Sequence, residues 1–348
     1  MLEIDGSHGE GGGQILRTAL SLSSLSGTPF RIVNIRRGRR KPGLMPQHMA
    51  AVRAAQAISA ATVEGAEHGS TVLAFTPHAL SGGSFAFDIG TAGAVTLVLQ
   101  TLIPPLLRAD RPSRVLLSGG THVPFSPSVN YLAEVFAPML KRLGGELRLS
   151  IEAYGFYPRG GGRIRAEIIP ARELRPLSFS APDEPRRATV TGCSGVCRLP
   201  LSIAERQRTA SLAALGAMPA DSFPPPQIEL LEAPGPGQGT FLFLRAETGN
   251  GLAGSTALGA RGKRAETVGS EAADELCRHL ATGAALDPHL ADQLVPFLAL
   301  SRGESDFTTS RITPHLLTNL WVAGLFLPLR VRVAGEEGGA GRVTITPC

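Results

Sequence analysis

The chain has 348 residues and a formal net charge of +5, with 43% hydrophobic and 18% charged residues. These values exclude a disordered chain and allow a large core divided between two domains. The longest apolar run is interrupted by Pro104-Pro105, and Met1–Asp5 leads directly into a polar loop without a signal peptide. We therefore expect a cytoplasmic protein that does not enter a membrane.

A glycine-rich loop at residues 5–13 opens an amphipathic helix at residues 14–22. The backbone N–H groups of such a loop can approach an anion closely, although a plain tight turn would use glycine in the same way. Glu10 would repel a phosphate, and a hard divalent cation between the two would reconcile them. Arg17 is one or two turns into the helix and could reach the same place.

A strand at residues 30–34 is followed by five cationic residues in the six positions 36–41, on a loop bounded by Gly and Pro. The cluster indicates either a phosphate clamp or a solvated basic loop, because guanidinium groups bind phosphate in a bidentate manner but also lie freely in water. Gln47 and His48 then begin a further helix.

The next part of the chain repeats a pattern of strand, glycine turn and apolar helix. Strands at residues 84–88 and 114–118 precede helices at residues 94–103 and 130–143. The pattern predicts a small α+β unit used several times, with helices packed on sheets. Gln100 on the first apolar helix is expected to be buried, so it needs a partner, either an internal group or a ligand.

The composition changes around residues 180–187, where we place a domain boundary. The segment that follows predicts strands at residues 188–193 and 239–244 and helices at residues 202–215 and 265–281. It contains no recognisable chemical constellation. We interpret residues 185–283 as a smaller inserted α/β domain, and residues 1–184 with 284–348 as a large domain of repeated units in which helices pack on four-stranded sheets.

After this insertion, Asp292 and Gln293 begin an apolar stretch. The simplest interpretation is that the two residues cap a helix. The segment 306–309 is a short strand or turn, and residues 329–333 and 343–345 predict closing strands.

The segment 310–319 reads as the start of a helix. Thr313 can act as the N-cap, and Pro314 fits the first helical position. His315 would then lie in the first turn, where the helix dipole favours anions and disfavours a protonated imidazole. A neutral imidazole beside an anion site could attack a phosphorus atom, although the residue could also simply complete the helix start.

Several short motifs occur in a characteristic order along the whole chain. They are Asp5-Gly6, residues 9–17, residues 35–44, Gln47-His48, residues 96–101, residues 118–121, residues 155–162, residues 290–294 and residues 315–319. Together they resemble the RNA 3'-terminal phosphate cyclases. The resemblance implies ATP-dependent conversion of an RNA 3'-phosphate to a 2',3'-cyclic phosphodiester, with release of AMP and pyrophosphate, through a covalent histidine-AMP intermediate.

The resemblance also implies roles for individual residues. His315 is implied as the nucleophile and Glu10 as a ligand of a divalent cation, Mg²⁺ or Mn²⁺. The residues implied in phosphate or RNA binding are Arg17, Arg36, Arg39, Gln47 and His48. Those implied in ATP binding are Gln100, His289, Leu290, Ala291, Asp292 and Gln293. Arg37 and Arg40 match no family position well and receive no role.

Two positions depart from the pattern of the family. His289 stands where the family often has a tyrosine suited to stacking on adenine, and Pro127-Ser128 replaces a Pro-Pro pair. Either change bears on the nucleotide pocket and leaves the nucleophile intact. Two alternatives stay open: a relative of the same fold that acts in ribosome assembly without catalysis, and an enzyme of the enolpyruvyl transferase type. The sequence leaves open whether the protein forms a homodimer.

Overall fold

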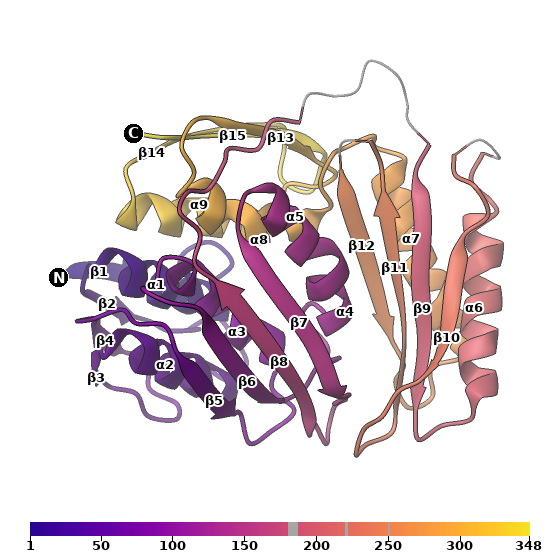
Figure 1. Cartoon of the computed structure of the whole chain (residues 1–348), viewed down its shortest axis with the longest axis horizontal. Coiled ribbons are helices and arrows are strands. Elements are labelled where there is room, and N and C mark those ends of the chain that lie inside the picture. Colours follow the sequence, from indigo (N-terminus) through magenta and orange to yellow (C-terminus); the bar gives the residue numbers. More distant parts are fainter. Residues whose placement is uncertain (180–186, 220–221, 250) are drawn as a thin grey trace.

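The computed structural model describes residues 1–179, 187–219, 222–249 and 251–348. In this part of the chain the strands form three four-stranded sheets and one three-stranded sheet, each packed with helices (Figure 1). The expected fold of repeated α+β units is confirmed. One detail is corrected: the last sheet has three strands rather than four.

The first two units share one topology. In the first, the sheet order is β1-β2-β4-β3, and β1 and β2 pair in parallel. Its elements are β1 (Leu2–Asp5), α1 (Gly13–Ser26), β2 (Phe30–Val33), α2 (Pro46–Ser59), β3 (Thr62–Glu64) and β4 (Leu73–Thr76). The second sheet has the equivalent order β5-β6-β8-β7. Its elements are β5 (Ser84–Asp88), α3 (Val95–Leu106), β6 (Ser113–Gly119), α4 (Val129–Tyr131), η1 (Leu132–Phe136), α5 (Ala137–Arg142), β7 (Glu146–Ala153) and β8 (Gly162–Ile169).

Helix α3 corrects the prediction that its apolar segment ends at residue 103. It continues through Pro104 and Pro105 to Leu106. A proline lacks the donor that an interior position needs, but here the two prolines fall in the last turn and both are buried in the core. Apolar burial therefore offsets the lost hydrogen bonds.

The third unit is built from one continuous stretch and has the order β10-β9-β11-β12. Its elements are β9 (Thr189–Cys197), α6 (Leu201–Leu215), β10 (Gln227–Glu232), β11 (Gly239–Glu247), β12 (Leu252–Leu258) and α7 (Ala265–Leu280). Strand β11 alternates between two cores: Phe241 and Phe243 join the main core, whereas Leu242 and Leu244 join a smaller core with α7. The predicted boundary after residue 184 lies outside the described residues, and the division into two domains stays a prediction.

The fourth unit contains α8 (Pro288–Leu298), β13 (Ser305–Thr309), α9 (Pro314–Phe326), β14 (Leu329–Ala334) and β15 (Gly341–Pro347). Its strands pair in the order β13-β15-β14. Helix α9 packs on α1 and α8, and α1 also packs on α2 and α3. The helices of three units thus meet in one layer, and the N-terminal ends of α1 and α9 come together there.

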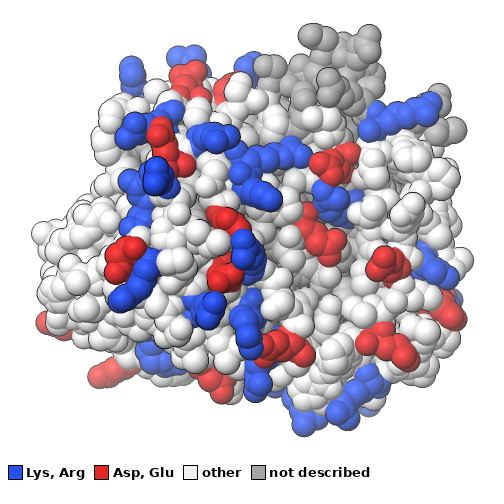
Figure 2. Space-filling model, in the orientation of Figure 1, with Lys and Arg blue, Asp and Glu red and all other residues white. Residues whose placement is uncertain are grey.

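No helix among the described residues is long and apolar enough to cross a bilayer. Figure 2 shows Lys and Arg interspersed with Asp and Glu on one face of the molecule. The net charge of +5 therefore does not by itself mark a binding surface.

Candidate active site

A cavity of about 420 Å³ lies where the helix layer meets the third unit. Helices α1, α3, α8 and α9, strand β12, helix α7 and the loop before α4 all contribute side chains to it. The predicted site residues that line it are Arg17, Gln100, His289, Asp292, Gln293 and His315. Leu290 and Ala291 do not line it, because their side chains are buried in the hydrophobic core.

His315 stands in the first turn of α9, as predicted. The Thr313 hydroxyl accepts a hydrogen bond of 3.0 Å from the Leu316 N–H, and Pro314 occupies the first helical position. The lowered pKa of His315 agrees with the expected neutral imidazole. Burial lowers the pKa of His315 to about 4, and nearby positive charges, Arg17 foremost, act in the same direction.

Glu10 lies between His315 and the basic loop. Its Oε2 is 3.7 Å from Nδ1 of His315, and its carboxylate forms an ion pair with Arg39. The buried Oε2 has no hydrogen-bond partner among the described residues. An orphaned carboxylate oxygen of this kind is suited to a hard divalent cation, with the remaining ligands supplied by water and by substrate phosphates. No cluster of three or more His, Cys, Asp or Glu in the described chain could hold a metal on its own.

Arg17 and Asp292 place opposite charges on the wall of the cavity. Burial lowers the pKa of Arg17 to about 10, while the charge of Asp292 opposes that change. Burial raises the pKa of Asp292 to about 7. Asp292 does not cap its helix, which corrects the simplest reading of the sequence. Asp287 is the cap, and Asp292 therefore falls one turn inside α8, where it faces the cavity.

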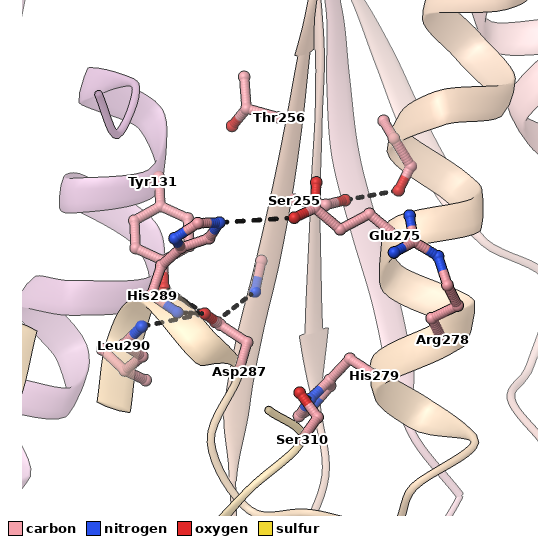
Figure 3. A network of polar contacts seen from close by, with 12 residues as sticks. Tyr131, Ser255, Thr256, Glu275, Arg278, His279, Asp287, His289, Leu290 and Ser310 are labelled. Atoms are coloured by element: carbon pink, nitrogen blue, oxygen red, sulfur yellow. Dashed lines mark hydrogen bonds and ion pairs between the residues drawn. The ribbon is translucent and has the colours of Figure 1, made fainter. Parts of the chain in front are cut away.

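The Asp287 carboxylate joins three units at the edge of the cavity (Figure 3). It accepts hydrogen bonds from the His289 and Leu290 N–H groups of its own helix, at 2.8 and 2.9 Å. It also accepts from the Tyr131 hydroxyl, at 2.8 Å to Oδ2, and from the Gly254 N–H of β12, at 3.0 Å. One carboxylate thus fixes the start of α8 against both neighbouring sheets.

His289 contacts the third unit through Glu275, with 3.5 Å between Nε2 and Oε1 (Figure 3). Burial by itself would lower the pKa of His289, but the neighbouring carboxylates raise it to about 9. His289 is therefore cationic at neutral pH. Residues 185–283 supply Glu275 and Thr256 to the cavity. This corrects the interpretation that the segment contains no chemical constellation.

A buried polar chain holds α1, α8 and α9 together beside the cavity. The Thr18 hydroxyl donates to the Asn319 side-chain oxygen at 2.7 Å, and the Asn319 amide donates to the Asp292 carbonyl at 2.9 Å. The Glu10 N–H donates to the Thr318 hydroxyl at 3.2 Å. These contacts set the position of the glycine-rich loop relative to His315.

The side chains of three further candidates form hydrogen bonds with the backbone of the protein itself. Arg36 donates through Nη1 to the carbonyls of Lys41 and Gly43, at 2.7 and 2.9 Å. Gln47 accepts from the Ala94 N–H at 2.9 Å, and Nδ1 of His48 accepts from the Met45 N–H at 3.1 Å. Burial lowers the pKa of His48 to about 3, with Arg17 and Arg36 contributing. Their roles towards RNA or phosphate stay predictions.

The structure also changes the environment predicted for Gln100. The side chain is half-buried rather than buried, because it lines the cavity. Gln293 lines the same cavity, and its buried Oε1 has no hydrogen-bond partner among the described residues. Both amides are therefore available to a ligand. Phe125, fully exposed at the rim, belongs to no predicted motif, and an exposed aromatic side chain was the signal that could have drawn attention to it.

Comparison with known proteins matches residues 8–333 to the family described as "RTC: RNA 3'-terminal phosphate cyclase". A protein of Methanopyrus kandleri with the name RNA 3'-terminal phosphate cyclase is 45% identical over 354 residues, covering 100% of this chain and 99% of the relative. A protein of the same name from Methylococcus capsulatus is 47% identical, covering 99% of this chain and 96% of the relative. Among solved structures, the enolpyruvyl transferase NikO from Streptomyces tendae covers 99% of this chain and 47% of its own, with a TM-score of 0.41 and 11% identity.

Proposed function

The chain belongs to the RNA 3'-terminal phosphate cyclase family, and on this premise we propose that it converts RNA 3'-phosphate ends to 2',3'-cyclic phosphodiesters with consumption of ATP. We propose that His315 carries AMP during the reaction and that the enzyme acts on RNA in the cytoplasm. One observation carries the proposal: an uncharged imidazole at the start of a helix faces a cavity of about 420 Å³ and has two arginines and an orphaned carboxylate beside it.

The position of Glu10 selects the nitrogen of His315 that reacts. Glu10 lies on the Nδ1 side of the ring, so a proton on Nδ1 is favoured by the carboxylate. The lone pair is then on Nε2. In the first step Nε2 attacks the α-phosphorus of ATP, an N–P bond forms, the bond between the α-phosphorus and its bridging oxygen breaks, and pyrophosphate leaves.

The RNA takes part in the next two steps. An oxygen of the RNA 3'-phosphate attacks the same phosphorus, the N–P bond breaks, and its electron pair returns to His315. The vicinal 2'-hydroxyl then attacks the 3'-phosphorus, loses its proton, and displaces AMP as the cyclic phosphodiester closes. Neither step consumes His315, which is restored for another cycle.

Negative charge develops on the phosphate oxygens in the transition state of each step, and cationic side chains lie where they can neutralise it. Arg17 lines the cavity beside His315, and Arg39 lies on the other side of Glu10. Glu10 would hold a divalent cation through its orphaned Oε2, and that cation would supply further neutralisation of the phosphates. Arg39 is paired with Glu10, so its guanidinium stays directed towards the same region.

The amides of the cavity suit the nucleoside part of ATP. The unpaired Oε1 of Gln293 can accept from an amino or hydroxyl group, and Gln100 supplies both a donor and an acceptor. His289 offers a ring and a positive charge at the wall of the cavity. We propose that these three residues, with Asp292, hold the nucleoside part while His315 faces the α-phosphate.

The test is labelling with ATP that carries radioactive phosphorus at the α position, in the presence of Mg²⁺ or Mn²⁺. We expect an acid-labile protein-AMP adduct that disappears in His315→Asn, while the variant keeps its melting temperature. A 3'-phosphorylated oligonucleotide should then discharge the adduct and become cyclised. An unlabelled wild-type protein would favour the ribosome-assembly relative or the transferase, and a fully labelled His315→Asn variant would rule out His315 as the nucleophile.

The metal role of Glu10 makes a separate prediction. Glu10→Gln removes the charge of the carboxylate but keeps its size, so the metal concentration for half-maximal adenylylation should rise about tenfold or more. Glu337→Gln, a change at an exposed carboxylate nearby, is the matched control and should leave the metal titration unchanged. If Glu10→Gln and Glu337→Gln titrate alike, Glu10 does not hold the cation.

A further inference from the structure

A second hollow, separate from the nucleotide cavity, is lined by Glu10 and the basic loop. It is open and has a volume of about 1020 Å³. We call it the Arg37 groove, after one of the residues that line it: His8, Glu10, Arg37, Arg39, Leu317 and Glu337. The reactions of ATP proposed above use only the end of this groove at Glu10 and Arg39, and they assign no role to the part that His8 and Arg37 line.

The groove and the nucleotide cavity share a wall. His315 faces the cavity, whereas Pro314, Leu317 and Thr318 of the same helix line the groove. Glu10 lines the groove and is 3.7 Å from His315. A 3'-phosphate that enters along the groove past His8 and Arg37 would therefore reach His315 from outside the cavity assigned to the nucleoside part of ATP. The second substrate needs such an approach, because AMP still fills the cavity when that substrate attacks.

Arg37 gives the groove a cation that is available to a ligand. Its guanidinium forms no ion pair or hydrogen bond with any described residue, whereas Arg39 is engaged by Glu10. The only other carboxylate along the described part of the groove is Glu337, which is exposed. Arg40 and Lys41 are exposed on the same loop and extend the positive charge outward. This arrangement matches a chain of phosphodiesters.

The groove also presents an aromatic surface. The ring of His8 stacks on Trp321, with 3.8 Å between centroids and 18° between planes. Trp321 is half-buried on α9, so it holds the exposed His8 ring in a fixed orientation, and His8 itself lines the groove. A nucleobase can extend an ordered stack without sequence preference, which is how single-stranded nucleic acids are commonly bound.

We propose that the Arg37 groove binds the 3'-terminal segment of single-stranded RNA, with Arg37 on a backbone phosphate and the His8–Trp321 pair under a base. The inference rests on the proposed function and extends it by naming residues that recognise RNA and take no part in adenylylation. The proposal assigns RNA binding to Arg37, a residue that matches no family position well and to which the resemblance assigns no role.

The experiment measures RNA binding and adenylylation separately on the full chain. The probe is a fluorescent, single-stranded oligoribonucleotide with a 3'-phosphate, and binding is followed by anisotropy without ATP. Arg37→Gln should weaken binding about tenfold and reduce the slope of log affinity against log salt by roughly 0.7. His8→Ala should weaken binding about tenfold, and His8→Phe, which keeps an aromatic ring, should restore most of the affinity. All three variants should form the protein-AMP adduct at a rate within twofold of the wild type.

Arg208→Gln is the matched control. Arg208 lies on α6, on the other side of the molecule from α1 and α9 (Figure 1), and its side chain forms no hydrogen bond or ion pair with the described residues. The proposal would be overturned if Arg37→Gln and Arg208→Gln showed the same RNA affinity and the same salt slope. Absence of RNA binding by the wild type would also overturn it. Loss of adduct formation in parallel with RNA binding would show that Arg37 acts on the fold. Failure of the wild type to form any adduct would instead contradict the proposed function. The RNA-binding measurements would still test the groove in that case, because they are made without ATP.

Discussion

At the scale of single residues, the chemistry depends on how the surroundings set the charge of each group. Burial lowers the pKa of His315 to about 4, whereas neighbouring carboxylates raise that of His289 to about 9. Two histidines that line one cavity are thus neutral and cationic at the same pH. The neutral one can act as a nucleophile, and the cationic one attracts phosphate.

The pKa of His315 predicts the pH dependence of adenylylation. The imidazole loses its nucleophilic lone pair when it is protonated, so the contribution of His315 should be constant from about pH 6 to 8 and fall only as the pH drops through about 4. The rate of single-turnover labelling with ATP measures it.

Asp292 requires a control, because its pKa of about 7 lies in the same cavity and could add a change near neutrality. Asp292→Asn removes that group. A decline centred near pH 6.5 that persists in Asp292→Asn would mean that His315 has an ordinary pKa.

At the scale of elements, the start of α8 is fixed by one buried carboxylate. Asp287 accepts from two N–H groups of its own helix, from Tyr131 and from the Gly254 N–H. The cap lies at the mouth of the cavity, so the same contacts place His289 and Asp292 relative to His315.

Asp287→Ala should therefore reduce stability strongly. It removes a helix cap and leaves buried donors unsatisfied, which together correspond to about 3 kcal/mol. Urea denaturation followed by circular dichroism measures the loss. Asp287→Asn keeps one acceptor oxygen and should recover part of it. If both variants unfold at the wild-type midpoint, the network around Asp287 contributes little.

At the scale of the whole molecule, the third unit closes the cavity through contacts with α8. The pair formed by His289 and Glu275 crosses this junction, and their side chains keep 49% and 35% exposure. Solvent screens such a pair, so its contribution is under about 1 kcal/mol. The raised pKa of His289 means that this stabilisation is full at pH 6.5 and is lost as the pH rises through about 9, and protonation of Glu275, whose pKa is lowered, removes the pair in acid.

Glu275→Gln tests this junction. The variant should melt slightly below the wild type at pH 6, and the difference should vanish above pH 9, where His289 is neutral in both proteins. Thermal unfolding at several pH values provides the measurement. A difference that stays the same at pH 6 and pH 10 would show that the effect of Glu275 does not involve the charge of His289.

Local signals in the sequence were sufficient for many elements, including the helix start that carries His315. Thr313, Pro314 and His315 predict the start of α9, because a cap, a first-turn proline and the residue after it depend only on neighbours along the chain. The apolar periodicity of α1, α6 and α7 predicts helices close to those observed. Short strands such as β3, with three residues, escape prediction because they contain too few positions to show alternation.

The tertiary structure decided which contacts surround His315 and what charge the neighbouring residues carry. Glu275, Asp287 and Asn319 reach the site through contacts between units that are distant in the chain. Their local sequence does not show these contacts, even though Asp287 precedes a first-turn proline and Asn319 belongs to the segment 315–319. The sequence attributes the neutrality of His315 to the helix dipole, and the structure adds burial and the charge of Arg17, which both lower its pKa. Desolvation and the distances between charges arise only when the units pack, and therefore no pattern along the chain contains them.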